Sequence, residues 1–148
     1  MKNLSFLFVL LLSVLSLSAQ EFHADVNALG DAWVMAFERG DAAALAATYA
    51  DEVEIVNDDG SVRTATRAEI EANWQKTFAA YTGSIELGSD QIITQTDDGK
   101  ARAQGSFTQT MTNQKTGESN TFEGYYDHQA VQVDGQWRFC HMETMAKE

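Results

Sequence analysis

The sequence predicts an α+β domain shaped like a cone, in which three N-terminal helices pack in a curved sheet of mixed or antiparallel strands. Two patterns support this prediction: large apolar residues recur at helical spacing in the first half of the chain, and apolar and polar residues alternate from residue 84 onward. The 148 residues are 44% apolar and contain no proline, no Gly/Ser-rich linker and no internal repeat. We therefore expect one domain, over residues 20–148, with its own core.

Residues 1–19 have the features of a secretory signal peptide. Lys2 supplies a positive charge, residues 6–12 form an apolar run, and residues 16–19 provide the small side chains that a signal peptidase requires. The alternative is a membrane anchor, which needs about 20 apolar residues, whereas Ser13, Ser16 and Ser18 interrupt the apolar stretch that begins with this run. We expect a secreted or periplasmic protein that is free of the membrane after the signal is cleaved.

The first helix of the domain should carry one apolar stripe. Val26, Leu29, Trp33 and Phe37 lie at helical spacing, and Gly40 provides a stop signal. The helix should therefore end close to residue 39.

A short second helix over residues 42–47 is expected next, with Asp41 as its N-cap. Residues 52–56 alternate like a half-buried strand and lead into a turn at residues 57–60. Thr66 and Glu69 have the spacing of a capping box, which predicts the start of a third helix. The apolar stripe of that helix consists of Ile70, Trp74, Phe78 and Tyr81, and Gly83 would end it.

The second half of the chain should form long antiparallel strands. One strand face is predicted to carry Ala101, Ala103, Gly105, Phe107 and Met111. Asp134 and Gly135 predict a two-residue hairpin turn between a strand over residues 121–133 and another over 137–142. A curved sheet around long helices closes a cone, and the mouth of the cone is the expected ligand pocket.

The charge balance excludes some classes of partner. Ten Lys and Arg residues oppose 22 Asp and Glu residues, which gives a net charge of −12. Nucleic acids and anionic membrane surfaces are therefore not expected partners, because phosphate contacts need cationic side chains. A neutral or cationic small ligand is favoured over an anionic one. The single cysteine, Cys140, excludes an intrachain disulfide.

Three sequence segments resemble the nuclear-transport-factor-2-like superfamily. They are FERGD at residues 37–41, LAATYADEV at residues 45–53 and DGQWR at residues 134–138. Within the superfamily the chain is similar to the small SnoaL-like and ketosteroid-isomerase-like proteins, which implies the cone fold over the whole mature chain. Members include isomerases, cyclases, epoxide hydrolases, binding modules and oligomerisation domains, so the chemistry must be argued from the site.

The resemblance to ketosteroid isomerases assigns three catalytic positions. Asn57 stands where they have a carboxylate base. An amide cannot take a proton from carbon, so this base is missing unless Asp58 or Asp59 reaches the pocket. Trp33 stands where they have a tyrosine that donates to the oxyanion. Asp127 stands where they have a protonated aspartic acid. In an apolar cavity its pKa would be raised, whereas on an exposed strand it would be an ordinary carboxylate.

The expected ligand contacts are mostly aromatic or apolar side chains. They are Trp33, Phe37, Trp74, Phe78, Phe107, Tyr125, Cys140 and Met142, although most of the helical aromatic residues should also belong to the core. The register that places Asp127 inside turns His141 to the outer face of the sheet, and a bulge in either strand would exchange these faces. Trp137 and Phe139 would make the outer face half apolar, which predicts a homodimer paired through that face.

No metal or cofactor is expected. His128, His141 and Glu143 lack the close spacing of metal ligands. The two Asp-Asp-Gly sequences are typical of turns, and Cys140 is expected to be a half-buried thiol rather than a nucleophile.

Three functions remain open from the sequence. The first is an exported module that binds a small, largely apolar ligand in the cone. The second is a lyase, isomerase or cyclase that uses Asp127 to stabilise negative charge while Asn57 or Asp58 orients substrate or water. The third is a protein association or dimerisation domain with a vestigial pocket.

Overall fold

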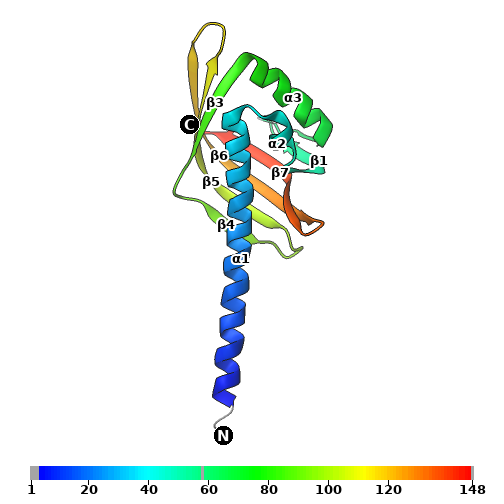
Figure 1. Cartoon of the computed structure of the whole chain (residues 1–148), viewed down its shortest axis with the longest axis vertical. Helices are drawn as coiled ribbons and strands as arrows, with labels where there is room; N and C mark the ends of the chain where they lie inside the picture. Colours follow the sequence, from blue (N-terminus) through cyan, green and yellow to red (C-terminus); the bar gives the residue numbers. More distant parts are fainter. Residues whose placement is uncertain (1–3, 58, 148) are drawn as a thin grey trace.

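The computed structural model of the chain describes residues 4–57 and 59–147. It begins with one long helix, α1 (Leu4–Arg39), whose N-terminal part projects away from the rest of the molecule (Figure 1). The helix ends at the expected stop, because Gly40 adopts a φ of 65°, which favours glycine. Among the described residues, no helix is long and apolar enough to span a membrane.

The two other helices begin at the predicted caps. The side chain of Asp41 accepts a hydrogen bond from the backbone N–H of Ala44, at 2.9 Å, and starts α2 (Ala42–Ala46). Thr66 and Glu69 form the predicted capping box at the start of α3 (Arg67–Ala80). Each side chain accepts from the backbone of the other residue, at 3.3 and 2.8 Å.

Helix α3 ends three residues before the predicted stop at Gly83, because the chain continues as strand β3 (Tyr81–Leu87). Pairing with strand β5 (Ala101–Asn113) determines this boundary, since Tyr81 pairs with Asn113 at the start of the ladder. Gly83 serves a different purpose. A Cβ atom there would lie only 2.5 Å from Cζ of Phe37, so the glycine lets α1 pack closely against the sheet.

In the part of the chain that the structure describes, seven strands form one mixed sheet. The other strands are β1 (Tyr49–Val56), β2 (Val62–Thr66), β4 (Ile92–Gln95), β6 (Ser119–Val133) and β7 (Gln136–Ala146). Their order is β2-β1-β7-β6-β5-β3, and β4 also pairs with β5. Strands β1 and β7 are parallel and every other pair is antiparallel, which confirms the predicted mixed sheet.

The β6–β7 hairpin has the predicted two-residue turn but an unpredicted bulge. Asp134 and Gly135 both have positive φ angles, of 51° and 77°, as a type I′ turn requires. Further along, Ala130 pairs with Phe139 whereas Gln129 pairs with His141. Cys140 is therefore the extra residue of a β-bulge.

The bulge corrects the expected faces of β7. Trp137 and Phe139 are buried in the core, and Met142 also packs against it, because the alternation of side chains changes phase at Cys140. The expectation that Trp137 and Phe139 lie on the outer face is therefore wrong. Their burial transfers two large aromatic side chains from the predicted dimer surface to the interior.

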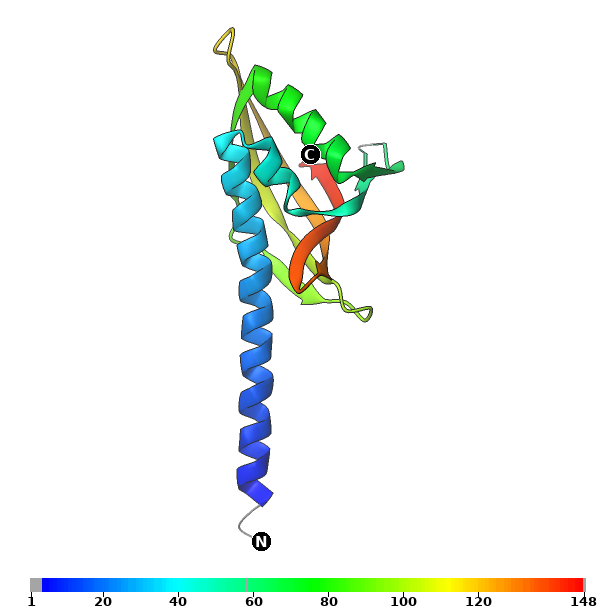
Figure 2. The same cartoon turned by 45° about the vertical axis from the view of Figure 1, so that its right-hand side comes forward.

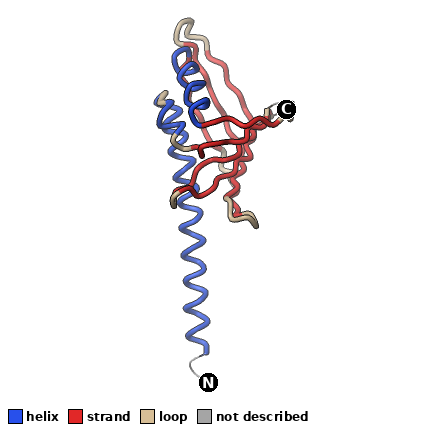
Figure 3. Tube along the Cα trace, turned by 90° about the vertical axis from the view of Figure 1, so that its right-hand side faces the viewer, coloured by secondary structure: helices blue, strands red, loops and turns tan. Residues whose placement is uncertain are grey.

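The core lies between the helices and the concave face of the sheet. All three helices lie on the same side of the strands, with α1 running along the sheet and α3 closing one end (Figures 2 and 3). Phe37 of α1, Leu45 of α2 and Val53 of β1 are fully buried. Phe22 marks the start of the packed part of α1, since its ring meets that of Trp137 at 5.6 Å.

Candidate functional site

An apolar cavity of about 110 Å³ lies between α1 and the concave face of the sheet. Side chains from α1, β3, β5, β6 and β7 surround it, including Trp33, Phe107, Tyr126, His128, Phe139 and Met142. Gln91 and Thr144 line the cavity and are also exposed, so it opens to solvent beside them. This opening gives a small molecule a route into the cone.

Gly30 contributes open space to the cavity wall. It lies within α1, where glycine costs about 1 kcal/mol relative to alanine. A Cβ atom at this position would have no neighbour within 4 Å, so close packing does not require the glycine. The helix therefore gives up stability at a point where the missing side chain enlarges the cavity.

Three of the predicted ligand contacts lie in the cavity wall, and three lie in an adjoining aromatic cluster. Trp33, Phe107 and Met142 line the cavity. Phe37, Trp74 and Phe78 instead pack against one another beside Trp33. The Trp33 and Phe37 rings stack at 5.3 Å, and the Trp74 and Phe78 rings at 5.2 Å. The cluster supports the wall.

A buried hydrogen bond fixes the indole of Trp33. Its Nε1 donates to the hydroxyl oxygen of Tyr49 at 2.7 Å. Burial raises the pKa of Tyr49 to about 12, so the phenol stays neutral and can accept this bond at every physiological pH. Trp33 replaces the tyrosine of the ketosteroid isomerases in sequence, but its N–H is already used by the protein.

Asp127 does not face the cavity, so the expected placement is wrong. Its carboxylate accepts hydrogen bonds from Nε of Arg102, at 2.8 Å, and from Nε2 of Gln104, at 3.0 Å, and Nη2 of Arg102 completes a bidentate ion pair. The hydrogen bonds from Arg102 hold the pKa of Asp127 below its usual range. Asp127 is an anion on the outer face, not a protonated donor in a pocket.

The residue that faces the cavity from this part of β6 is His128. The inward side chains of β6 are Tyr126, His128 and Ala130, one position out of phase with the predicted pattern. Burial lowers the pKa of His128 to about 4, so its imidazole is neutral at pH 7. Its Nε2 atom is buried and, within residues 18–57 and 59–147, has no hydrogen-bond partner.

The alternation of Tyr126, His128 and Ala130 is the sequence signal that points to His128. With Asp127 placed inward, the opposite set of β6 side chains is expected to face the cavity, and an unbroken ladder then places Cys140 of β7 inward as well. The ladder pairs Ala130 with Phe139 and His128 with Met142. These four side chains share one face of the sheet because the bulge lies between Phe139 and Met142. No glycine or proline marks that bulge in the sequence.

The remaining predicted site residues lie elsewhere. Asn57 belongs to the turn after β1, where its Nδ2 donates to Oγ of Ser61 at 2.9 Å, and Asp58 lies outside the described residues. Tyr125 points to the outer face and is 42% exposed, and Cys140 occupies the bulge, where burial raises the pKa of its thiol. Asn57, Tyr125 and Cys140 are therefore not among the residues that line the cavity.

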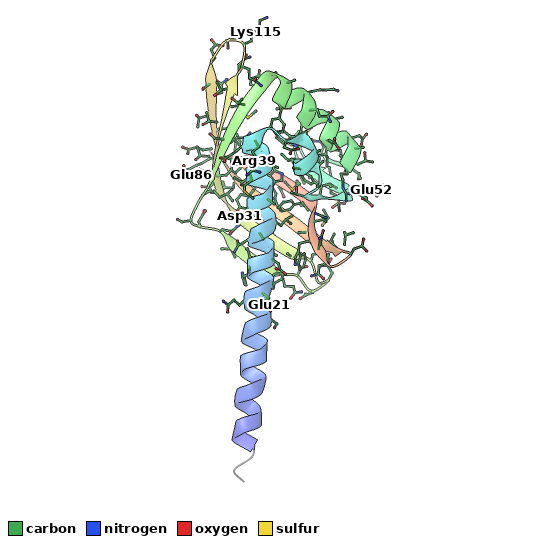
Figure 4. The ribbon with its side chains drawn as sticks, viewed as in Figure 1. Glu21, Asp31, Arg39, Glu52, Glu86 and Lys115 are labelled. Atoms are coloured by element: carbon green, nitrogen blue, oxygen red, sulfur yellow. The ribbon has the colours of Figure 1, made fainter. Side chains whose placement is uncertain are left out.

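The lining of the cavity is uncharged. Its described residues include no Asp, Glu, Lys or Arg, and its polar groups are those of Gln91, Gln109, Tyr126, His128 and Thr144. The hydroxyl of Tyr126 accepts a hydrogen bond from Gln91 at 3.1 Å, and burial raises its pKa. The charged side chains that Figure 4 labels, such as Glu52 and Glu86, lie at the periphery of the domain.

No group of three or more His, Cys, Asp or Glu side chains in the described part of the chain could hold a metal ion. His141 lies on the outer face, where its Nδ1 is 3.3 Å from Oε2 of Glu54. It is therefore separated by the sheet from His128 on the inner face.

Comparisons with known proteins place this geometry in a family. A model of the SnoaL-like domain matches residues 20–143. No curated protein gives a significant match.

Three solved structures illustrate the fold. A candidate scytalone dehydratase from Novosphingobium aromaticivorans is 16% identical, with a TM-score of 0.79 over 90% of this chain and 89% of that one. A ketosteroid isomerase-like protein from Erwinia carotovora atroseptica is 20% identical, with a TM-score of 0.67 over 84% and 95%. A candidate calcium/calmodulin-dependent protein kinase II association domain from Xanthomonas campestris is 25% identical, with a TM-score of 0.65 over 82% and 85%.

These likenesses confirm the predicted cone fold and the resemblance to the nuclear-transport-factor-2-like superfamily. The family model covers far more than half of the sequence, from within α1 to within the last strand, β7. The chain belongs to the family of SnoaL-like domains.

Proposed function

We propose that the protein binds a small, neutral and largely apolar ligand in the cavity between α1 and the sheet. The observation that carries this proposal is the cavity lining, which is mostly apolar and, among the residues that the structure describes, includes no charged side chain. An ion placed there would lose its hydration without gaining a counter-ion, which is strongly unfavourable. A neutral ligand avoids this cost.

The cavity volume limits the size of the ligand. About 110 Å³ is somewhat less than the roughly 150 Å³ of an apolar cavity that accepts benzene. The ligand should therefore place one ring, or a group of similar size, inside the cone. Gly30 supports the same conclusion, because its open Cβ position keeps this space free at a cost to helix stability.

Toluene is a suitable probe of this proposal. In two-dimensional amide NMR spectra of the mature protein, added toluene should shift the resonances of residues that line the cavity. Gly30→Leu would extend a side chain from α1 into the cavity and should abolish these shifts.

Asp31→Leu is the matched control, because it adds the same side chain at the adjacent, exposed position of α1 (Figure 4). This variant should retain toluene binding. The proposal is refuted if toluene leaves the cavity resonances of the wild-type protein unchanged, or if Gly30→Leu and Asp31→Leu bind toluene equally well.

Export is a further part of the proposal. Lys2, the apolar run at residues 6–12 and the small residues at 16–19 support cleavage near residue 19. Cleavage there would leave Phe22 and its contact with Trp137 in the mature chain. Mass spectrometry of the protein recovered from the periplasm or medium should find an N-terminus close to residue 20, and an intact Met1 would contradict this.

We also propose that the outer face of the sheet pairs two copies of the chain. Trp137 and Phe139 no longer support this, but Tyr125 and Met145 do. They are cross-strand neighbours on that face, and their side chains are 42% and 45% exposed. Size-exclusion chromatography with light scattering should show a dimer at micromolar concentration, and a monomer would overturn the proposal.

A further inference from the structure

His128 lines the cavity and carries a hydrogen-bonding atom that the described residues leave unused. Its Nε2 is buried, and no described side chain or backbone group bonds to it. Buried polar atoms in native proteins are nearly always paired, because an unpaired one keeps the full cost of its lost hydration. We therefore expect Nε2 of His128 to form a hydrogen bond with a group that the described residues do not supply.

The surroundings of the imidazole prevent the protein from supplying that partner. The ring lies 5.1 Å from the ring of Tyr126 and meets the edge of Phe139 at 5.7 Å, and its cross-strand neighbour is Met142. The ring of Phe139 and the thioether of Met142 offer no strong acceptor or donor for an imidazole nitrogen, and the hydroxyl of Tyr126 is hydrogen-bonded to Gln91 instead. All four side chains line the cavity, so a molecule held in it would lie beside the imidazole.

The imidazole is also in the right state to recognise a neutral group. It is uncharged at pH 7 because burial disfavours its protonated form. A neutral imidazole has one nitrogen that donates and one that accepts, and a hydroxyl group can pair with either because it both donates and accepts.

We propose that the ligand is a neutral single-ring compound with a hydroxyl group, and that this hydroxyl pairs with Nε2 of His128 inside the cavity. This inference rests on the proposed function, because it specifies the ligand class of the same site. The apolar wall selects the ring, and His128 selects the hydroxyl. The polar edge of the ring should therefore point to β6, with its apolar edge toward Gly30 and Trp33 of α1.

Phenol and toluene test the inference as a matched pair, because they have the same ring and nearly the same size. Their dissociation constants are measured by calorimetry for the wild-type protein and for His128→Leu. Loss of one hydrogen bond should weaken phenol binding by about tenfold relative to toluene. Gln129→Leu is the matched control, since Gln129 is the next residue of β6 and points to the outer face, and it should leave the ratio unchanged.

NMR of the wild-type protein gives a readout that does not depend on whether a variant folds. Phenol should shift the ¹⁵N resonance of Nε2 of His128 by several parts per million more than toluene does. If neither probe binds, the proposed function itself fails. If both bind but His128→Leu leaves their ratio unchanged, or if Tyr126→Phe removes the preference for phenol instead, then His128 is not the recognition group and this inference alone is refuted.

Discussion

The neutral, buried imidazole of His128 predicts a specific loss of stability in mild acid. Its pKa is about 4 in the folded protein, below the 6.5 of an exposed histidine. As the pH falls below 6.5, His128 takes up a proton in the unfolded chain but not yet in the folded one. The unfolded state then binds more protons, and the stability contributed above pH 6.5 is lost progressively down to about pH 4.

The magnitude follows from these two pKa values. Between pH 7 and pH 5 the linkage relation gives a loss of about 2 kcal/mol from His128 alone. The charge of Asp127 favours protonation of His128 and that of His141 opposes it, but the effect of desolvation on the pKa of His128 is larger than either. The loss is a substantial fraction of the stability of an ordinary domain.

Urea unfolding followed by tryptophan fluorescence measures the stability that His128 contributes, when His128→Leu is the reference. All other ionisable groups are common to the two proteins, so the difference between them isolates the contribution of His128. The free energy of unfolding of the wild-type protein should fall by about 2 kcal/mol more than that of His128→Leu between pH 7 and pH 5. Equal losses in the two proteins would refute a buried, neutral His128.

Three other substitutions test the local structure. Gly30→Ala should stabilise the protein by about 0.5–1 kcal/mol, seen as a higher melting temperature, because the added methyl group improves the helix and meets no neighbour; a lower melting temperature would count against the open Cβ position. Thr66→Ala should destabilise it by about 1 kcal/mol through loss of the capping box with Glu69, as urea unfolding would show, whereas an unchanged midpoint would argue against the box. Trp33→Phe should lower the free energy of unfolding by about 1–3 kcal/mol, because the buried hydroxyl of Tyr49 loses its donor. Ultraviolet titration of the tyrosines should differ between this variant and the wild type, and identical titrations would mean that the hydrogen bond does not form.

The elements predicted correctly are those that local chemistry determines. Gly40 ends α1, Thr66 and Glu69 start α3, and Asp134 with Gly135 forms the hairpin turn, since each feature depends on residues within one turn of the chain. The end of α3 was misplaced at Gly83 for the opposite reason. That glycine is needed for close contact with Phe37, which lies 46 positions earlier in the printed sequence and becomes a neighbour only after folding.

The candidate site was predicted in kind but only partly in detail. The apolar cavity, Trp33 and Phe107 follow from the periodicity of the helix and strands. Met142 lines the cavity as expected, but it does so opposite His128 and not opposite Asp127, because of the bulge. The polar group of the cavity does not follow from periodicity. Asp127 and His128 are adjacent in β6 and point to opposite faces, so a shift of one residue exchanges them. The bulge at Cys140 then determines which β7 side chains accompany it, and bulges arise from the pairing of whole strands rather than from a local sequence signal.

A crystal structure of residues 20–148 under xenon pressure would show the proposed cavity itself. Xenon enters apolar cavities of this size without requiring any particular ligand chemistry. We expect one strong xenon peak between Gly30 of α1 and Phe107 and Met142 of the sheet, and no such peak in Gly30→Leu. A wild-type interior with no xenon at this position would mean that side chains fill the cone and that no ligand cavity exists.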